Sequence, residues 1–309
     1  MYMVSFIVTM SSDDWFLVWV GLEINMLSFL VLMFRRCSLK IIESCLKYFF
    51  IQSLGSALFI SMFYLNYYEM GYMWLIMLSY KIGAGPFFYW FPSLCSGVNW
   101  LICYFLMIFQ KFLPLLLISM FVCWFMWLMA WMSLLMGIFG SFNQNNIKQL
   151  LGYSSIHHLG WIYMIGMNNG EIFWLLYLML YSVVLLSVVI LLIKGEVINF
   201  IKMYSSEYKL LFILSMLSMA GLPPLLGFYL KWMALLIIIE FSKLYLMMMV
   251  LVSVVMLYIY MRILYDIFMG GSMKNSWFSW KLSKYNIFVD IYSIMGIMMG
   301  MFVGIYMLM

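Results

Sequence analysis

The chain has 309 residues, of which 68% are hydrophobic and 9% are charged, whereas about a quarter of the residues in an ordinary soluble domain are charged. This composition, with a mean hydropathy of +1.08, excludes a soluble domain, and the small net charge of +5 gives no reason to expect a nucleic-acid partner. We therefore expect a membrane protein.

Runs of about twenty apolar residues recur along the whole chain, and each is long enough to cross a hydrocarbon core of about 30 Å as a helix. The runs are continuous, whereas the strands of a membrane barrel alternate apolar and polar residues. The segments are 15–34, 45–66, 72–92, 98–118, 120–141, 147–167, 172–193, 209–239, 244–268 and 286–308. Residues 1–10 form a shorter apolar helix, which crosses only if the bilayer thins or neighbouring helices shelter it. The prediction is an all-α polytopic membrane protein with about 10–11 transmembrane helices.

Other features point away from a soluble catalytic centre. No charged region or small-residue cleavage site precedes Asp13, so we expect no cleaved signal or transit peptide. The five cysteines lack Cys-x-x-Cys spacing, so neither a metal site nor disulfide chemistry is expected. The sequence has no phosphate-binding loop, no dinucleotide fingerprint and no ligand quartet for haem or an iron–sulfur cluster. We expect residues 1–309 to form a single transmembrane domain.

The charged residues of the connections predict the orientation of the chain. If residues 1–10 count as the first helix, the connections after even-numbered helices carry twelve basic residues, and those after odd-numbered helices carry only Lys243. The twelve are Arg35, Arg36, Lys40, Lys47, Lys148, Lys194, Lys202, Lys209, Arg262, Lys274, Lys281 and Lys284. Because basic loops stay on the side where a chain is made, the even side and the N-terminus are predicted to face that compartment.

Four charged residues remain inside apolar segments. They are Glu23, Lys81, Lys111 and Lys231. On insertion scales each costs about 2.5–3.5 kcal/mol at the helix centre, and a plain membrane anchor needs none of them. One carboxylate cannot neutralise three lysines, so at least some of these lysines must be neutral, hydrated or exchanging protons. The alternative is an inert network of buried ion pairs that fixes helix packing.

Glu23 and Lys81 lie near the centres of their segments and could form a pair. Burial favours the neutral form of a lysine, whereas a nearby carboxylate favours its charged form. A movement of Glu23 away from Lys81 could therefore release a proton from the lysine.

Two of the apolar segments contain helix-breaking residues beside a lysine. Lys81 is followed by Gly83, Gly85 and Pro86, and the segment 209–239 carries a Gly-Leu-Pro-Pro run before Lys231. Interrupted segments in corresponding halves of a chain indicate inverted repeats whose binding site lies where the breaks meet. Lys111 precedes Pro114, and this proline frees a backbone carbonyl that water or the lysine could use.

The segment 147–167 contains the adjacent residues His157 and His158. Neighbouring side chains on a helix point about 100° apart, so the two rings are badly placed to bind one metal ion. A packing role and a role in a proton relay both remain open for them.

Several runs in the chain together resemble one family. The runs are Gly21–Phe29, Lys47–Phe49, Gln52–Ser56, Lys81–Pro92, Gln110–Lys111 with Pro114, Asn143–Gln144, Tyr153–Ile156, His158–Trp161 and Gly221–Trp232. They are similar to the corresponding runs of the NADH dehydrogenase subunit 2 family. Members of this family are mitochondrially encoded, antiporter-like subunits of the membrane arm of respiratory complex I. The resemblance extends from residue 21 to residue 232.

This resemblance implies an antiporter-like fold with inverted repeats and two discontinuous helices. It implies proton translocation coupled to NADH oxidation and ubiquinone reduction by NADH:ubiquinone reductase, with Glu23, Lys81, Lys111 and Lys231 as the translocating residues and His158 as a relay. It implies no cofactor in this chain, because NADH, FMN, iron–sulfur clusters and ubiquinone are bound by other subunits. Other membrane-arm subunits and phospholipids would be the partners, and the N-terminus would face the matrix across the mitochondrial inner membrane.

Three departures and two rival functions accompany the resemblance. The helix of residues 1–10 is shorter than is usual in the family. Phe88 stands where the family usually has a histidine, so a relay role at that point is lost or taken over by water, and Gly85 replaces a common alanine. One rival function is a cation/proton antiporter component without a redox partner. The other is a structural scaffold of the membrane arm that does not pump.

Overall fold

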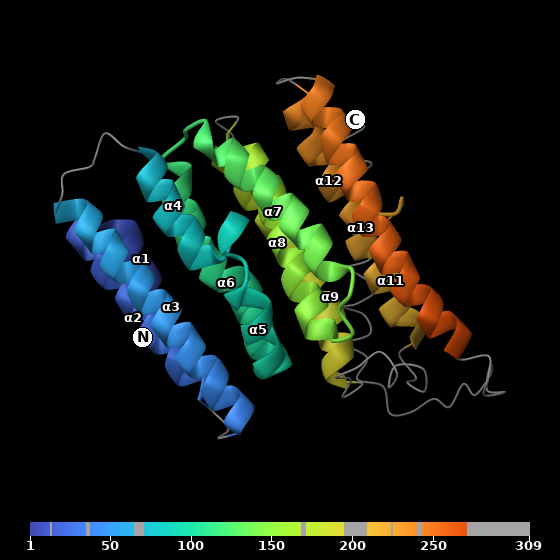
Figure 1. Ribbon diagram of the computed structural model, residues 1–309, viewed down its shortest axis with the longest axis horizontal. Coiled ribbons are helices and arrows are strands. Elements are labelled where there is room, and N and C mark those ends of the chain that lie inside the picture. The colour runs from blue at the N-terminus through green and yellow to red at the C-terminus, as the bar shows by residue number, and fades with distance from the viewer. Residues whose placement is uncertain are drawn as a thin grey trace. The chain divides into compact units, whose positions relative to one another are not determined.

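The computed structural model describes residues 1–12, 14–34, 38–64, 71–167, 171–194, 209–223, 225–239 and 243–270. The regular elements in these ranges are helices, shown in Figure 1. They are α1 (Tyr2–Ser11), α2 (Trp15–Met33), α3 (Leu39–Tyr64), α4 (Gly71–Ile82), η2 (Gly85–Phe87), α5 (Trp90–Gly97), α6 (Trp100–Ser119), α7 (Phe125–Ser141), α8 (Ile147–Gly166), α9 (Glu171–Lys194), α11 (Lys209–Ala220), α12 (Leu226–Ile238) and α13 (Lys243–Gly270). The all-α prediction is confirmed for this part of the chain.

Several predicted features lie outside the described residues. They are the helix 286–308 and the basic residues Arg35, Arg36, Lys202, Lys274, Lys281 and Lys284.

Five of the described helices are long and apolar enough to cross a membrane. These spans are Trp15–Met33, Leu39–Met62, Trp100–Ser119, Ile172–Ile193 and Tyr245–Tyr265. The ten residues of α1 rise only about 15 Å, which is half of a hydrocarbon core. Helix α1 is therefore too short to span the hydrocarbon core by itself.

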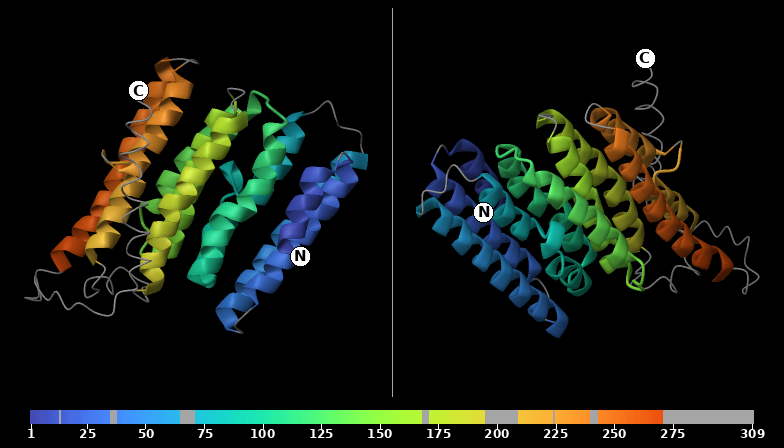
Figure 2. Two further views of the ribbon diagram at one scale, coloured as in Figure 1. Left: turned by 180° about the vertical axis from the view of Figure 1, so that it is seen from behind. Right: turned by 45° about the horizontal axis from the view of Figure 1, so that its top comes forward.

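The chain divides into two compact units. The first contains Met1–Phe139 and Lys148–Glu171, and the second contains Gly140–Ile147 and the chain from Ile172 onward. In the first unit α2 packs between α1 and α3, and α3 also contacts α4 and α5 (Figures 1 and 2). In the second unit α11, α12 and α13 pack against one another. The expectation of a single domain over residues 1–309 stays a prediction.

The first predicted break separates α4 from α5. Gly83 and Gly85 have φ angles of 76° and 61°, a left-handed conformation that glycine adopts without steric cost. The amides of Gly83 and Ala84 both donate to the carbonyl of Ser79 at 3.0 Å, which closes the end of α4. The short helix η2 then begins at Gly85, and Pro86 lies in its first turn.

The second predicted break separates α11 from α12 and has the same local chemistry. Gly221 has a φ angle of 83°, and its amide donates to Leu217 O at 3.1 Å. The next amide, that of Leu222, donates to the same carbonyl at 3.3 Å. The prediction of two discontinuous helices is therefore confirmed.

The sequence placed the start of one helix too late. Helix α3 begins at Leu39, six residues before the predicted start at residue 45, because Ser38 caps it and accepts hydrogen bonds from the amide of Ile41 at its carbonyl and its hydroxyl oxygen. Glu43 and Lys47 consequently lie inside α3 and do not belong to a connection.

Replacing Gly227 by alanine should destabilise the second unit by about 3 kcal/mol, since a Cβ atom there would lie 1.6 Å from the carbonyl oxygen of Ser218. The measurement is the thermal stability of the solubilised assembly and the amount of chain that it retains. Gly71→Ala is the matched control, because no atom lies within 4 Å of a Cβ at that position. Equal stability of the two variants would contradict the close contact between α11 and α12.

Candidate functional site

The three lysines predicted inside apolar segments are buried. Lys81 is 6% exposed, Lys111 is 3% exposed and Lys231 is 8% exposed. Within the described ranges, the one ion pair shorter than 4 Å joins Glu43 and Lys47 on the surface of α3. The buried lysines therefore do not depend on a carboxylate in direct contact.

Lys81 lies in the last turn of α4, directly before the first break. The C-terminal end of a helix is its negative pole, so this position favours a cation. A Cβ atom at Gly55 of α3 would come within 2.9 Å of Lys81 Cγ, which shows how closely the lysine lies against α3. Gln52 of the same helix donates from Nε2 to the backbone oxygen of Lys81 at 2.8 Å. Helix α3 thus holds both the side chain and the backbone of Lys81.

Lys111 lies on α6, and its ammonium group is bound by the backbone of another helix. Its Nζ donates to Ser155 O in α8 at 3.1 Å and lies 4.5 Å from the centre of the Phe91 ring. Pro114 lies inside α6 as predicted, but the lysine uses the carbonyl of Ser155. Helices α5, α6 and α8 together enclose this cation.

Lys231 lies on α12 and reaches back across the second break. Its Nζ donates to the carbonyl oxygen of Ala220, the last residue of α11, at 2.7 Å. The last carbonyl groups of a helix have no partner within that helix, so they are available to such a donor. A Cβ atom at Gly221 would lie 3.0 Å from the same Nζ atom, so the glycine also makes room for the lysine.

The three lysines share one kind of environment. The ammonium groups of Lys111 and Lys231 donate to carbonyl oxygens of another helix, and Lys81 lies in the C-terminal turn of α4. In membrane transporters, helix C-termini and unwound carbonyl groups at broken helices are the groups that coordinate sodium ions and protons. The arrangement is suited to holding a proton at a lysine without placing a permanent negative charge beside it.

Glu23 on α2 is partly exposed, and the structure does not show the predicted direct pair with Lys81. Nearby, Asn25 is buried, and its Oδ1 accepts a hydrogen bond of 3.2 Å from Nε2 of Gln110, the residue before Lys111. The role of Glu23 as a switch for Lys81 stays a prediction.

His157 and His158 lie on α8, within one turn of the carbonyl group that binds Lys111. Both are buried, and their ring centres lie 5.7 Å apart. The ring of His157 stacks on Trp161 with an interplanar angle of 12°. The relay role of His158 stays a prediction. In the ranges that the structure describes, no group of three or more His, Cys, Asp or Glu side chains could hold a metal ion.

The sequence did not single out two residues that organise this region. Gln52 is one, although it lies in a run that carried the family resemblance. Lys148 is the other, because the sequence analysis counted it only among the basic residues of the connections. It is half buried, and its Nζ donates to Val98 O, at the C-terminal end of α5, at 2.5 Å and lies 5.1 Å from the centre of the Trp100 ring.

Known proteins are similar to this chain over most of its length. The family described as "NADH:quinone oxidoreductase/Mrp antiporter, TM" matches residues 66–257. NADH-ubiquinone oxidoreductase chain 2 of Anopheles gambiae is 36% identical over 95% of this chain and 93% of its own length. The chain belongs to the NADH-ubiquinone oxidoreductase chain 2 family. The chain 2 protein of Aedes aegypti is 34% identical over 88% of this chain and 85% of its own length.

Chains of two larger assemblies of known structure have a similar fold. A chain of respiratory complex I from Thermus thermophilus has a TM-score of 0.78 and 20% identity, covering 98% of this chain and 77% of that one. A chain of the Mrp complex from Dietzia sp. DQ12-45-1b has a TM-score of 0.68 and 16% identity, covering 84% of this chain and 57% of that one. The predicted antiporter-like fold is confirmed.

Replacing Lys148 by alanine should loosen the C-terminal end of α5, because the carbonyl of Val98 would lose a charged donor worth about 1.5–3 kcal/mol. Cys95 on α5 is fully buried, so its reaction with a membrane-permeant maleimide reports this opening. We expect labelling of Cys95 to become about ten to a hundred times faster. Lys148→Arg, which keeps a cationic donor, is the control. Equal labelling of the alanine variant and the unmodified chain would show that Lys148 does not hold α5.

Proposed function

We propose that this chain is a proton-translocating subunit in the membrane arm of respiratory complex I, in the mitochondrial inner membrane. Its relatives carry the name NADH-ubiquinone oxidoreductase chain 2, and the fold is that of antiporter-like subunits. The observation that carries the proposal is the hydrogen bond from Lys231 to Ala220 O across a broken helix. Such a contact is of little use in a membrane anchor and well suited to a group that gains and loses a proton.

The chemistry follows from the two protonation states of a lysine. A charged Lys231 donates one of its three N–H groups to Ala220 O. After the proton leaves, the neutral amine still has N–H groups to donate, so the carbonyl remains bound in both states. The negative pole of α11 favours the charged form of Lys231, whereas burial favours its neutral form. A small change in the surroundings can therefore shift the protonation equilibrium of this lysine.

In this proposal the even side and the N-terminus face the matrix, and protons from the matrix load Lys81 or Lys111. They are later released from Lys231 to the opposite side. NADH oxidation and ubiquinone reduction in other subunits supply the energy, which arrives as shifts of charge near Glu23. The NADH, FMN, iron–sulfur and ubiquinone sites belong to those subunits, while other membrane-arm subunits and phospholipids surround this chain.

A second function, cation/proton antiport without a redox partner, is favoured by the likeness to the Mrp complex. The two functions differ in what they couple. A sodium flux through the purified assembly that persists without NADH would support the antiporter, and proton movement that follows NADH oxidation in sodium-free medium would support complex I.

Replacing Lys81 by methionine or Glu23 by glutamine should slow proton transfer through this chain by about a hundredfold or more, because each change removes a group that the transfer requires. The measurement is the number of protons moved per NADH oxidised by reconstituted complex. Lys243→Gln is the control, since Lys243 is an exposed charge at the start of α13. Unchanged proton output from fully assembled variant complexes would support the scaffold function instead.

A further inference from the structure

The outer face of α3 carries a stripe of exposed side chains with an unusual order. Along the helix the stripe consists of Lys40, Glu43, Lys47, Phe50 and Leu54. Their spacings of three and four residues place them on one face. The first three are charged, and the last two are large, apolar and 65% and 51% exposed. The stripe therefore changes from charged to apolar along a single helix.

The change from charged to apolar side chains follows the order of headgroup and acyl chains in one leaflet of a bilayer. Helix α3 begins at Leu39 on the predicted matrix side, so the charged end lies near the headgroups and the apolar end points toward the bilayer centre. Fourteen residues of helix separate Lys40 from Leu54, a rise of about 21 Å. One leaflet of a bilayer, with its headgroups, is about 20–22 Å thick. The stripe thus has the length and polarity of one phospholipid molecule.

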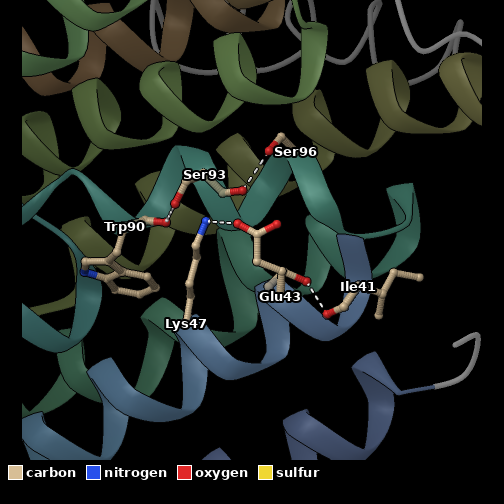
Figure 3. A network of polar contacts seen from close by, with 7 residues as sticks. Ile41, Glu43, Lys47, Trp90, Ser93 and Ser96 are labelled. Atoms are coloured by element: carbon tan, nitrogen blue, oxygen red, sulfur yellow. Dashed lines mark hydrogen bonds and ion pairs between the residues drawn. The ribbon is translucent and has the colours of Figure 1, made fainter. Parts of the chain in front are cut away.

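The charged end is built against a second helix. A Cβ atom at Gly97 of α5 would lie 2.9 Å from Ser44 Cβ and 3.0 Å from Lys40 O, so α5 touches α3 beside the stripe. Figure 3 shows Glu43 and Lys47 directed toward the turn of α5 that carries Ser93 and Ser96. The Glu43 carboxylate binds Lys47 Nζ at 2.5 Å, and these side chains remain 64% and 45% exposed.

The serines of α5 add hydrogen-bond acceptors to this end of the stripe. Ser93 Oγ donates to Trp90 O at 2.8 Å, and Ser96 Oγ donates to Ser93 O at 2.7 Å. Each hydroxyl has thereby used its hydrogen within α5, and its oxygen lone pairs stay available as acceptors. Both serines are partly exposed. The charged end therefore offers two cations, one carboxylate and two hydroxyl oxygens.

We propose that this face of α3, with the adjoining turns of α5, binds one phospholipid with a phosphate and a primary ammonium group, of the phosphatidylethanolamine class. Lys40 and Lys47 bind the phosphate, and Glu43 with the serine oxygens binds the ammonium group. An acyl chain lies along Phe50 and Leu54. A choline headgroup fits less well, because its quaternary nitrogen has no N–H group to donate to Glu43.

The test uses the whole purified assembly in nanodiscs that contain phosphatidylcholine and phosphatidylethanolamine, followed by mass spectrometry of the lipids that stay bound. We expect phosphatidylethanolamine to be enriched over phosphatidylcholine. Glu43→Gln should reduce the preference at this site about tenfold, the effect of losing one charge-assisted hydrogen bond. Lys47→Gln should reduce retention of both lipids, since both carry the phosphate.

Lys243→Gln, which removes an exposed charge on α13, is the matched control and should leave lipid retention unchanged. A photo-reactive phenylalanine analogue at Phe50 provides a second readout that needs no change in charge, and we expect it to capture a lipid. Capture of a neighbouring protein subunit would overturn the proposal. It would also fall if Glu43→Gln left the retained phosphatidylethanolamine unchanged.

Discussion

The structure depends on one constraint, which is that polar backbone groups within a bilayer must be satisfied by the protein itself. At Gly83 and Gly221 the chain leaves the helix, and the ends of α4 and α11 are closed by amides that fold back onto Ser79 and Leu217. Such ends concentrate carbonyl dipoles at one point. A lysine can be accommodated there at a depth where it is otherwise costly. The helix breaks therefore provide the carbonyl groups beside which a buried lysine can be accommodated.

The lysines at the two breaks lie differently relative to the helix ends. Lys81 precedes its break and lies in the closing turn of α4, so the helix that carries it also supplies the favourable dipole. Lys231 follows its break and bonds to a carbonyl of the preceding half-helix. Lys111 lies on an unbroken helix and uses a carbonyl of α8. The three lysines thus lie in three different positions relative to the helix ends and carbonyl groups near them.

The sequence predicted most of the fold because the constraints on it are local. Gly83, Gly85 and Gly221 mark the breaks through their backbone conformation, and the cost of a buried charge identifies Lys81, Lys111 and Lys231. The partners of these lysines were not predictable, because carbonyl oxygens are present at every residue and leave no mark in composition. The start of α3 was missed for a related reason. Lys40, Glu43 and Lys47 have the composition of a loop but lie on the exposed face of a helix.

The bond between Lys231 and Ala220 also gives the second break a mechanical property. The lysine side chain adds a hydrogen bond between two half-helices that also pack against each other where Gly227 lies beside Ser218. Any displacement that separates α11 from α12 must first pull the ammonium group from its acceptor. Because a neutral amine keeps N–H groups that can donate to Ala220 O, loss of a proton from Lys231 does not by itself require α11 and α12 to separate.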